Sequence, residues 1–129
     1  MTKAKNIILS AADLLAKETL EIREVQLDKG AVVYVKQMTG KERDSFEQSM
    51  MRKVPGKGGI IVHEHSLSNF RAKLAVRCLC DAEGNLLLKT TDADTIGENM
   101  SAARLEKIVN VAQEMNAISE EDKDGILKN

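Results

Sequence analysis

The sequence predicts an α+β fold: a single, mainly helical domain with an N-terminal β-hairpin and about four or five helices. Three observations support it. Apolar and polar residues alternate over residues 19–38 on both sides of a turn, as in two paired strands. Helix-capping pairs recur along the chain, and a helical apolar stripe follows Ser101. The chain has 129 residues, which suits one hydrophobic core.

The N-terminal elements are a short helix and the hairpin. Ser10 and Asp13 have capping-box spacing, which predicts a helix over about residues 11–18. In the first strand the alternation slips by one residue near Arg23 and Glu24, which indicates a β-bulge.

The sequence also predicts the hairpin turn and the second strand. Gly30, in Asp28-Lys29-Gly30, can adopt the positive φ that a tight turn requires. The β-branched run that follows, to Val35, favours a strand.

A second helix and a loop come next. Thr39 and Glu42 form another capping-box pair, which predicts a helix over about residues 40–53. The only proline, Pro55, then precedes the densest glycine cluster. We therefore expect a flexible Gly-rich loop over residues 54–65.

The remainder is predicted to be helical. Ser66 or Ser68 can begin a helix that ends near a turn at residues 81–85. Leucines 86–88 are interpreted as a short strand, although three residues show no periodicity.

Two more helices are expected toward the C-terminus. Thr91 can cap a short helix to about Glu98, and Ser101 opens the clearest helix of the chain. Ser119 is a last capping signal. The stripe of the long helix consists of Leu105, Ile108, Val109, Ala112 and Met115.

Composition and charge exclude several classes of function. No apolar run approaches the roughly 20 residues of a membrane span. The net charge of −1 provides no field that attracts nucleic acid. Cys78 and Cys80 form no disulfide framework, which favours a reducing cytosol. Residues 1–60 carry 11 basic and 8 acidic side chains, whereas residues 61–129 carry 8 and 12. Two ordinary solvated halves explain this difference, and head-to-tail self-association is the alternative.

Candidate catalytic and metal-binding residues are few. His63, His65 and the two cysteines are zinc-ligand types, but cysteines two apart on a helix point about 200° away from each other. The sequence contains no HExxH, phosphate-loop or GxSxG motif. We expect no enzymatic activity, no cofactor and no metal site.

Binding functions remain. The alternative function is a small nucleic-acid-binding regulator that uses basic helices at residues 41–53 and 70–77, although few aromatics are available to stack on bases. A protein partner is considered, because adjacent helical methionines cannot both point into one core and methionine adapts to varied contacts, and packing in a satellite core is the alternative explanation for them. The candidate partner-binding residues are Phe46, Met50, Met51, Ile126 and Leu127.

From Met38 onward the order of signals is similar to a known family. A capped helix starts at residues 38–43, a helix at 70–78 leads to a D-x-x-G-x-x-L turn at 81–87, and the chain closes on Met-Asn-Ala-Ile-Ser-Glu-Glu-Asp at 115–122. Over about residues 20–129 the chain resembles the tail assembly chaperones of long-tailed bacteriophages, in the short lambda-like form.

The resemblance implies a non-enzymatic protein of the host cell cytoplasm that acts in virion morphogenesis. Members of this family bind and solubilise the tape measure protein, self-associate, and are absent from the mature virion. In many such phages a frameshifted longer form recruits the tail tube protein. The resemblance implies neither a nucleic-acid nor a membrane partner, and it supplies no catalytic residues.

Overall fold

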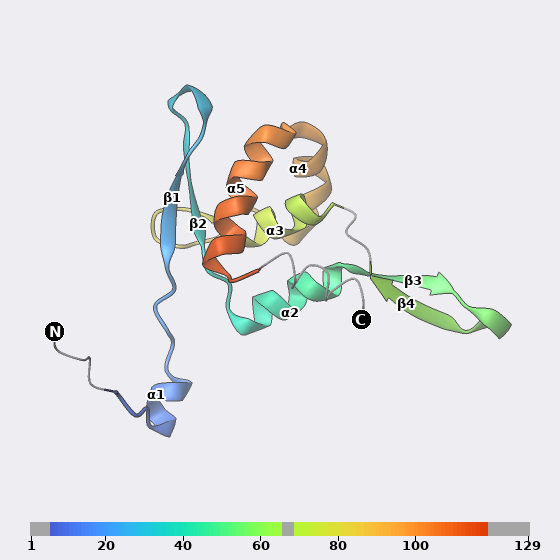
Figure 1. Ribbon diagram of the computed structural model, residues 1–129, viewed down its shortest axis with the longest axis horizontal. Coiled ribbons are helices and arrows are strands. Elements are labelled where there is room, and N and C mark those ends of the chain that lie inside the picture. The colour runs from blue at the N-terminus through green and yellow to red at the C-terminus, as the bar shows by residue number, and fades with distance from the viewer. Residues whose placement is uncertain (1–5, 66–68, 119–129) are drawn as a thin grey trace.

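The computed structural model describes residues 6–65 and 69–118 (Figure 1). Within them the helices are α1 (Ala11–Leu15), α2 (Gly40–Ser49), α3 (Phe70–Cys78), α4 (Ala93–Asn99) and α5 (Ala102–Met115). The strands are β1 (Ile22–Gln26), β2 (Val32–Lys36), β3 (Met51–Pro55), β4 (Ile61–His65) and β5 (Leu79–Cys80). Short 3₁₀ turns are η1 (Asp28–Gly30), η2 (Lys57–Gly59) and η3 (Thr90–Asp92). These elements form one α+β domain, so the predicted fold class is confirmed.

The N-terminal hairpin forms as the sequence predicts, but without the bulge. β1 and β2 pair in an unbroken antiparallel register from Ile22 opposite Lys36 to Gln26 opposite Val32. Val25 faces the core, whereas Ile22 lies on the other face of the strand, where a Cβ on Gly84 would lie 3.0 Å from its Cδ1. Because each face of β1 has its own apolar contact, the slip in alternation needs no extra residue.

The segment predicted as a flexible loop is instead most of a second hairpin. β3 and β4 pair antiparallel from Met51 opposite His65 to Pro55 opposite Ile61. Gly58 and Gly59 adopt φ of 71° and 77°, which lets the chain reverse tightly, and a β-branched run follows. The predicted helix over residues 40–53 is correspondingly cut short, because residues from Met51 onward pair with β4.

The helix starts agree with the sequence in part. Ser10 and Thr39 form complete capping boxes, and the Ser101 hydroxyl accepts from the Arg104 N–H at 3.2 Å. α1 ends at Leu15, short of the predicted 18. α4 follows η3 and begins at Ala93, so the predicted Thr91 cap is wrong.

Two further predictions concern the serine helix caps and the strand at residues 86–88. α3 begins after Asn69, while the serines predicted to cap it, at 66 and 68, and the Ser119 cap all lie outside the described residues. Of the three leucines predicted as a strand, Leu86 makes one isolated bridge to Cys80. The sheet's third strand is β5 instead, which pairs with β2.

The core lies where α3 and α5 pack together against the sheet and α2 (Figure 1). The stripe predicted on α5 is buried along its whole length. The two phenylalanines, Phe46 and Phe70, meet edge to face with ring centroids 5.4 Å apart, and their neighbours are mainly aliphatic.

Two segments stand away from this body in Figure 1. Residues 6–16, which include α1, are joined to β1 by an extended link, and are named the N-terminal arm. Residues 51–65, which form β3, η2 and β4, are named the hairpin arm. Among the described residues, no helix combines the length and apolarity needed to cross a bilayer.

Candidate interaction surfaces

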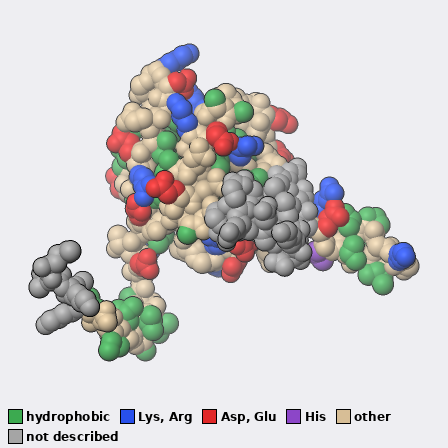
Figure 2. Space-filling view, viewed as in Figure 1, with side chains coloured by type: hydrophobic (Ala, Val, Ile, Leu, Met, Phe, Trp, Pro, Cys, Tyr) green, Lys and Arg blue, Asp and Glu red, His purple; other side chains and the backbone are tan. Residues whose placement is uncertain are grey.

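The N-terminal arm exposes large aliphatic side chains. Ile8 is 94% exposed and Leu15 is 87% exposed, and α1 buries none of its residues. Figure 2 shows hydrophobic side chains gathered on this arm. Its only charged residue is Asp13, which is used in the capping box. The full set of exposed aliphatics here is Ile7, Ile8, Leu9, Leu14 and Leu15.

An isolated helix as short as α1 is marginal in water, because forming the first helical turn costs more than its hydrogen bonds return. The capping box supplies local support: the Ser10 N–H donates to Asp13 at 2.9 Å. Within residues 6–65 and 69–118, nothing covers the arm's aliphatic side chains. The arm is therefore suited to apolar contact with another molecule.

The hairpin arm carries the second apolar surface. A hollow of about 270 Å³ is lined by its residues Lys53, Val54, Pro55, Gly59, Ile60 and Ile61. Ile60 and Ile61 are largely exposed, as is the neighbouring Val62. Figure 2 shows hydrophobic side chains along this arm and basic ones beside them.

Charge on the hairpin arm is mainly positive. Residues 51–65 contain three lysine or arginine residues and one acidic residue, Glu64. Glu64 forms an ion pair with Arg52: the Nε of Arg52 donates to the Oε1 of Glu64 at 2.6 Å. Lys53 and Lys57 have no ion-pair partner among the residues described. Of these two lysines, Lys53 lines the apolar hollow and Lys57 lies in the adjoining turn η2.

The partner-binding residues predicted from the sequence lie mostly elsewhere. Phe46 and Met50 are each 0% exposed, so neither can contact a partner in this conformation, and that prediction is corrected. Both belong to the central core, because α2 turns its apolar side toward α3. Met51 is 39% exposed at the start of the hairpin arm, while Ile126 and Leu127 lie outside the described residues.

The candidate zinc ligands are not brought together. His63 is exposed on β4, whereas Cys78 and Cys80 are buried in the core. Burial raises the pKa of the Cys78 thiol to about 12, so the thiol is neutral at physiological pH. Searching residues 6–65 and 69–118 finds no group of three His, Cys, Asp or Glu side chains able to hold a metal.

The basic stretches proposed for nucleic acid do not form a free stripe. Arg43 pairs with Glu47, and Arg71 pairs with Glu106 at 2.6 Å. Arg77 is buried within α3. Because residues 51–53 belong to β3, the first stretch is not a single helix.

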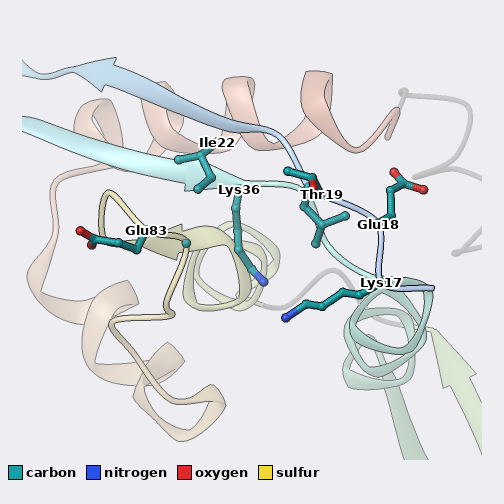
Figure 3. A pocket seen from close by; sticks show the side chains of 8 residues that line it. Lys17, Glu18, Thr19, Ile22, Lys36 and Glu83 are labelled. Carbon is teal, nitrogen blue, oxygen red and sulfur yellow. The ribbon is translucent and has the colours of Figure 1, made fainter.

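A further hollow of about 330 Å³ lies beside β1 (Figure 3). Lys17 and Lys36 point their ammonium groups toward one another across it, whereas Glu18 and Glu83 point away. Lys36 Nζ already pairs with Glu42 at 3.4 Å. Lys17 has no ion-pair partner among the described residues, and Leu20 and Ile22 form the apolar part of the lining.

Comparisons of the chain with protein-family models, with curated proteins and with solved structures find no match. Sequence reasoning did not single out the exposed aliphatic run of either arm, although the predicted residue Met51 lies at the start of the hairpin arm. The signals were present: Ile7-Ile8-Leu9 before a cap and Ile60-Ile61-Val62 after a turn. Both are apolar runs without helical periodicity.

Proposed function

We propose that this protein is a non-enzymatic tail assembly chaperone of a long-tailed bacteriophage, acting in the host cell cytoplasm. Its client is the tape measure protein, which it binds and keeps soluble during tail morphogenesis. The observation that carries this proposal is the N-terminal arm, with five large aliphatic side chains exposed on a segment that buries none of its residues in its own chain. The similarity in signal order from Met38 onward gives the choice of family.

The chemistry of the client fits such an arm. A long helical protein with apolar stripes aggregates unless its stripes are covered, and an amphipathic partner segment covers them by lying along the stripe. Each large aliphatic side chain gains about 1.5–3 kcal/mol when it is buried. One arm therefore supplies modest affinity, and several copies on one client supply avidity.

Recruitment of the tail tube protein belongs to the same proposal. It is assigned to a frameshifted longer form that adds a second domain to this one. In this scheme the present chain covers the client, and the longer form brings tube subunits to it.

Co-expression with the tape measure protein of the same phage tests the proposal. The wild-type chain should raise the soluble fraction of the client and co-purify with it in several copies. A variant with Ile8→Asp and Leu15→Asp should fold normally, because both side chains are exposed, and should lose most of this effect.

Leu87→Asp is the matched control, because Leu87 is a leucine 60% exposed on the body of the domain. It should solubilise the client as the wild-type chain does. A client that stays insoluble with the wild-type chain and with its longer form would contradict the proposal. If the arm variant and the control lost client solubilisation equally, the N-terminal arm would not be the client-binding surface.

A further inference from the structure

The hollow on the hairpin arm has a defined chemical character. Its floor is aliphatic, from Val54, Pro55, Ile60 and Ile61, and Lys53 forms part of its wall. Lys57 lies in the adjoining turn η2. A segment that carries carboxylates followed by large aliphatic side chains would match this surface in both respects.

Such a segment occurs in this chain. Residues 119–129 carry four acidic and two basic side chains, whereas the hairpin arm carries three lysine or arginine residues and one acidic residue. Four of the five residues 120–124 are acidic, and Ile126 and Leu127 follow after Gly125. We propose that the hollow on the hairpin arm binds residues 119–129 of a second copy of this chain.

The distance from the last described residues to the hollow favours binding of residues 119–129 from a second copy over binding of the chain's own residues 119–129. The last described residues are held beside the start of α2, since the Met38 N–H donates to Asn116 Oδ1 at 2.7 Å. From there α2 runs for ten residues, or about 15 Å, and Figure 1 shows the hairpin arm continuing in the same direction. The hollow lies about 10–17 Å farther along β3.

The chain's own segment can cover that distance only with no slack. Eight residues separate Ile118 from Ile126. Fully extended, they span at most about 28 Å, against a required path of about 25–32 Å. A neighbouring copy has no such limit, because it can approach the hollow from outside.

This contact is head-to-tail, since the two surfaces that meet are different. Heterologous contacts repeat from copy to copy and build open arrays or rings. The N-terminal arm takes no part in the contact, so it stays available in every copy. The inference goes beyond the proposed function and does not depend on the client's identity.

Charge reversal in the full chain tests it. The hairpin variant carries Lys53→Glu and Lys57→Glu, and the tail variant carries Glu120→Lys and Glu121→Lys. The molar mass of each protein is measured by light scattering over a range of concentrations, at low and high salt. The wild-type chain should self-associate, more weakly at high salt, and each variant should need at least tenfold higher concentration.

Mixing the two variants gives the sharpest result. The intact hollow of the tail variant can bind the intact tail of the hairpin variant, and the two charge-reversed surfaces again carry opposite charges, so an equimolar mixture should recover the self-association that each variant alone has lost. Lys17→Glu is the matched control, since it reverses a free lysine at the hollow beside β1, and it should associate as the wild-type chain does. Circular dichroism of each variant confirms that it is folded.

Several outcomes would overturn the inference: a wild-type chain that is monomeric at every concentration, variants that associate normally, or a mixture that associates no better than each variant alone. A hairpin variant that loses client solubilisation while it still self-associates would show that the hollow serves the client. Failure of the N-terminal arm variant to lose client solubilisation bears only on the proposed function.

Discussion

The backbone N–H of Met38 donates a hydrogen bond of 2.7 Å to Oδ1 of Asn116, although 78 residues separate the two. The same side chain donates through Nδ2 to the Ala112 carbonyl at 2.9 Å. Asn116 therefore joins the end of α5 to the strand-to-helix connection before α2. This junction fixes where the helical part of the domain meets the N-terminal hairpin.

Replacement of Asn116 by Ala should lower the free energy of unfolding by about 1–3 kcal/mol, because it leaves the Met38 N–H without its partner in a largely buried position. Chemical denaturation measures the change. Asn99→Ala is the control, since Asn99 is exposed at the end of α4, and it should change stability by less than about 0.5 kcal/mol. Equal effects would mean that the Met38 bond contributes nothing specific.

Ile108→Asp should unfold the domain. Ile108 is wholly buried in the α5 stripe, and an unpaired carboxylate there costs several kcal/mol, a large part of the stability of a domain of this size. The readout is the loss of the cooperative thermal transition. Asn110→Asp adds the same charge on the exposed side of α5 and should leave the transition nearly unchanged. A folded Ile108→Asp protein would show that the stripe is not required for the core.

The sequence predicted those parts of the fold whose signals are local and redundant. Ser10, Thr39 and Ser101 each combine a capping residue with a following helical pattern, and all three begin helices. The α5 stripe extends over about three turns, so packing against α3 reinforces the pattern instead of overriding it.

The hairpin arm was missed because its turn was interpreted by composition. Lys29 and Gly30 adopt φ of 58° and 76°, and Gly58 and Gly59 adopt 71° and 77°, so the two turns share one backbone shape. A cluster of glycines suggests flexibility when strand pairing is not visible. Phe46 was assigned to a partner for a related reason: one amphipathic helix does not reveal whether its apolar side meets another helix of the same chain.

Arg77→Met should leave the free energy of unfolding unchanged or raise it by up to about 2 kcal/mol. Arg77 is 7% exposed, and its Nε has no hydrogen-bond partner. Burial lowers the pKa of its guanidinium, and no carboxylate among the described residues pairs with it. A methionine keeps the side-chain volume and removes the buried charge.

The bonds that oppose this gain are those of Arg77 Nη1 to the Lys73 carbonyl at 2.7 Å and Nη2 to Ser45 at 3.4 Å. A loss of more than about 2 kcal/mol in Arg77→Met would show that they outweigh the cost of burying the charge. Arg71→Met, which removes an exposed ion pair with Glu106, is the comparison and should cost less than about 1 kcal/mol.

The Cys78 thiol should react very slowly with an alkylating reagent in the folded protein. Only the thiolate reacts, and with a pKa of about 12 instead of the ordinary 9 the thiolate fraction at pH 8 falls roughly 1,000-fold. Because the folded state favours the protonated form, stability contributed by this group is present below about pH 9 and is lost as pH rises toward 12.

Mass spectrometry after timed labelling measures the reaction, and the protein unfolded in guanidinium serves as the reference. Cys80 is also buried and should be protected too. Rapid labelling of either residue at neutral pH, without unfolding, would contradict the placement of both thiols in the core.

Amide hydrogen exchange should show that the hairpin arm is ordered but opens more easily than the N-terminal hairpin. Two backbone N–H groups occupy equivalent places in the two turns: Leu27 donates to the Ala31 carbonyl at 2.8 Å, and Gly56 donates to the Ile60 carbonyl at 2.6 Å. Leu27 packs against the core, whereas β3 and β4 form a two-stranded sheet, which is marginal when it stands alone. After correction for intrinsic rates, Gly56 should exchange at least tenfold faster than Leu27 in dilute protein, yet slower than an unstructured peptide.

The protection of the Gly56 amide should rise with protein concentration as a second copy covers the hairpin arm, whereas the protection of the Leu27 amide should not. A Gly56 amide that is unprotected at every concentration would support the flexible loop predicted from the glycines over an ordered hairpin.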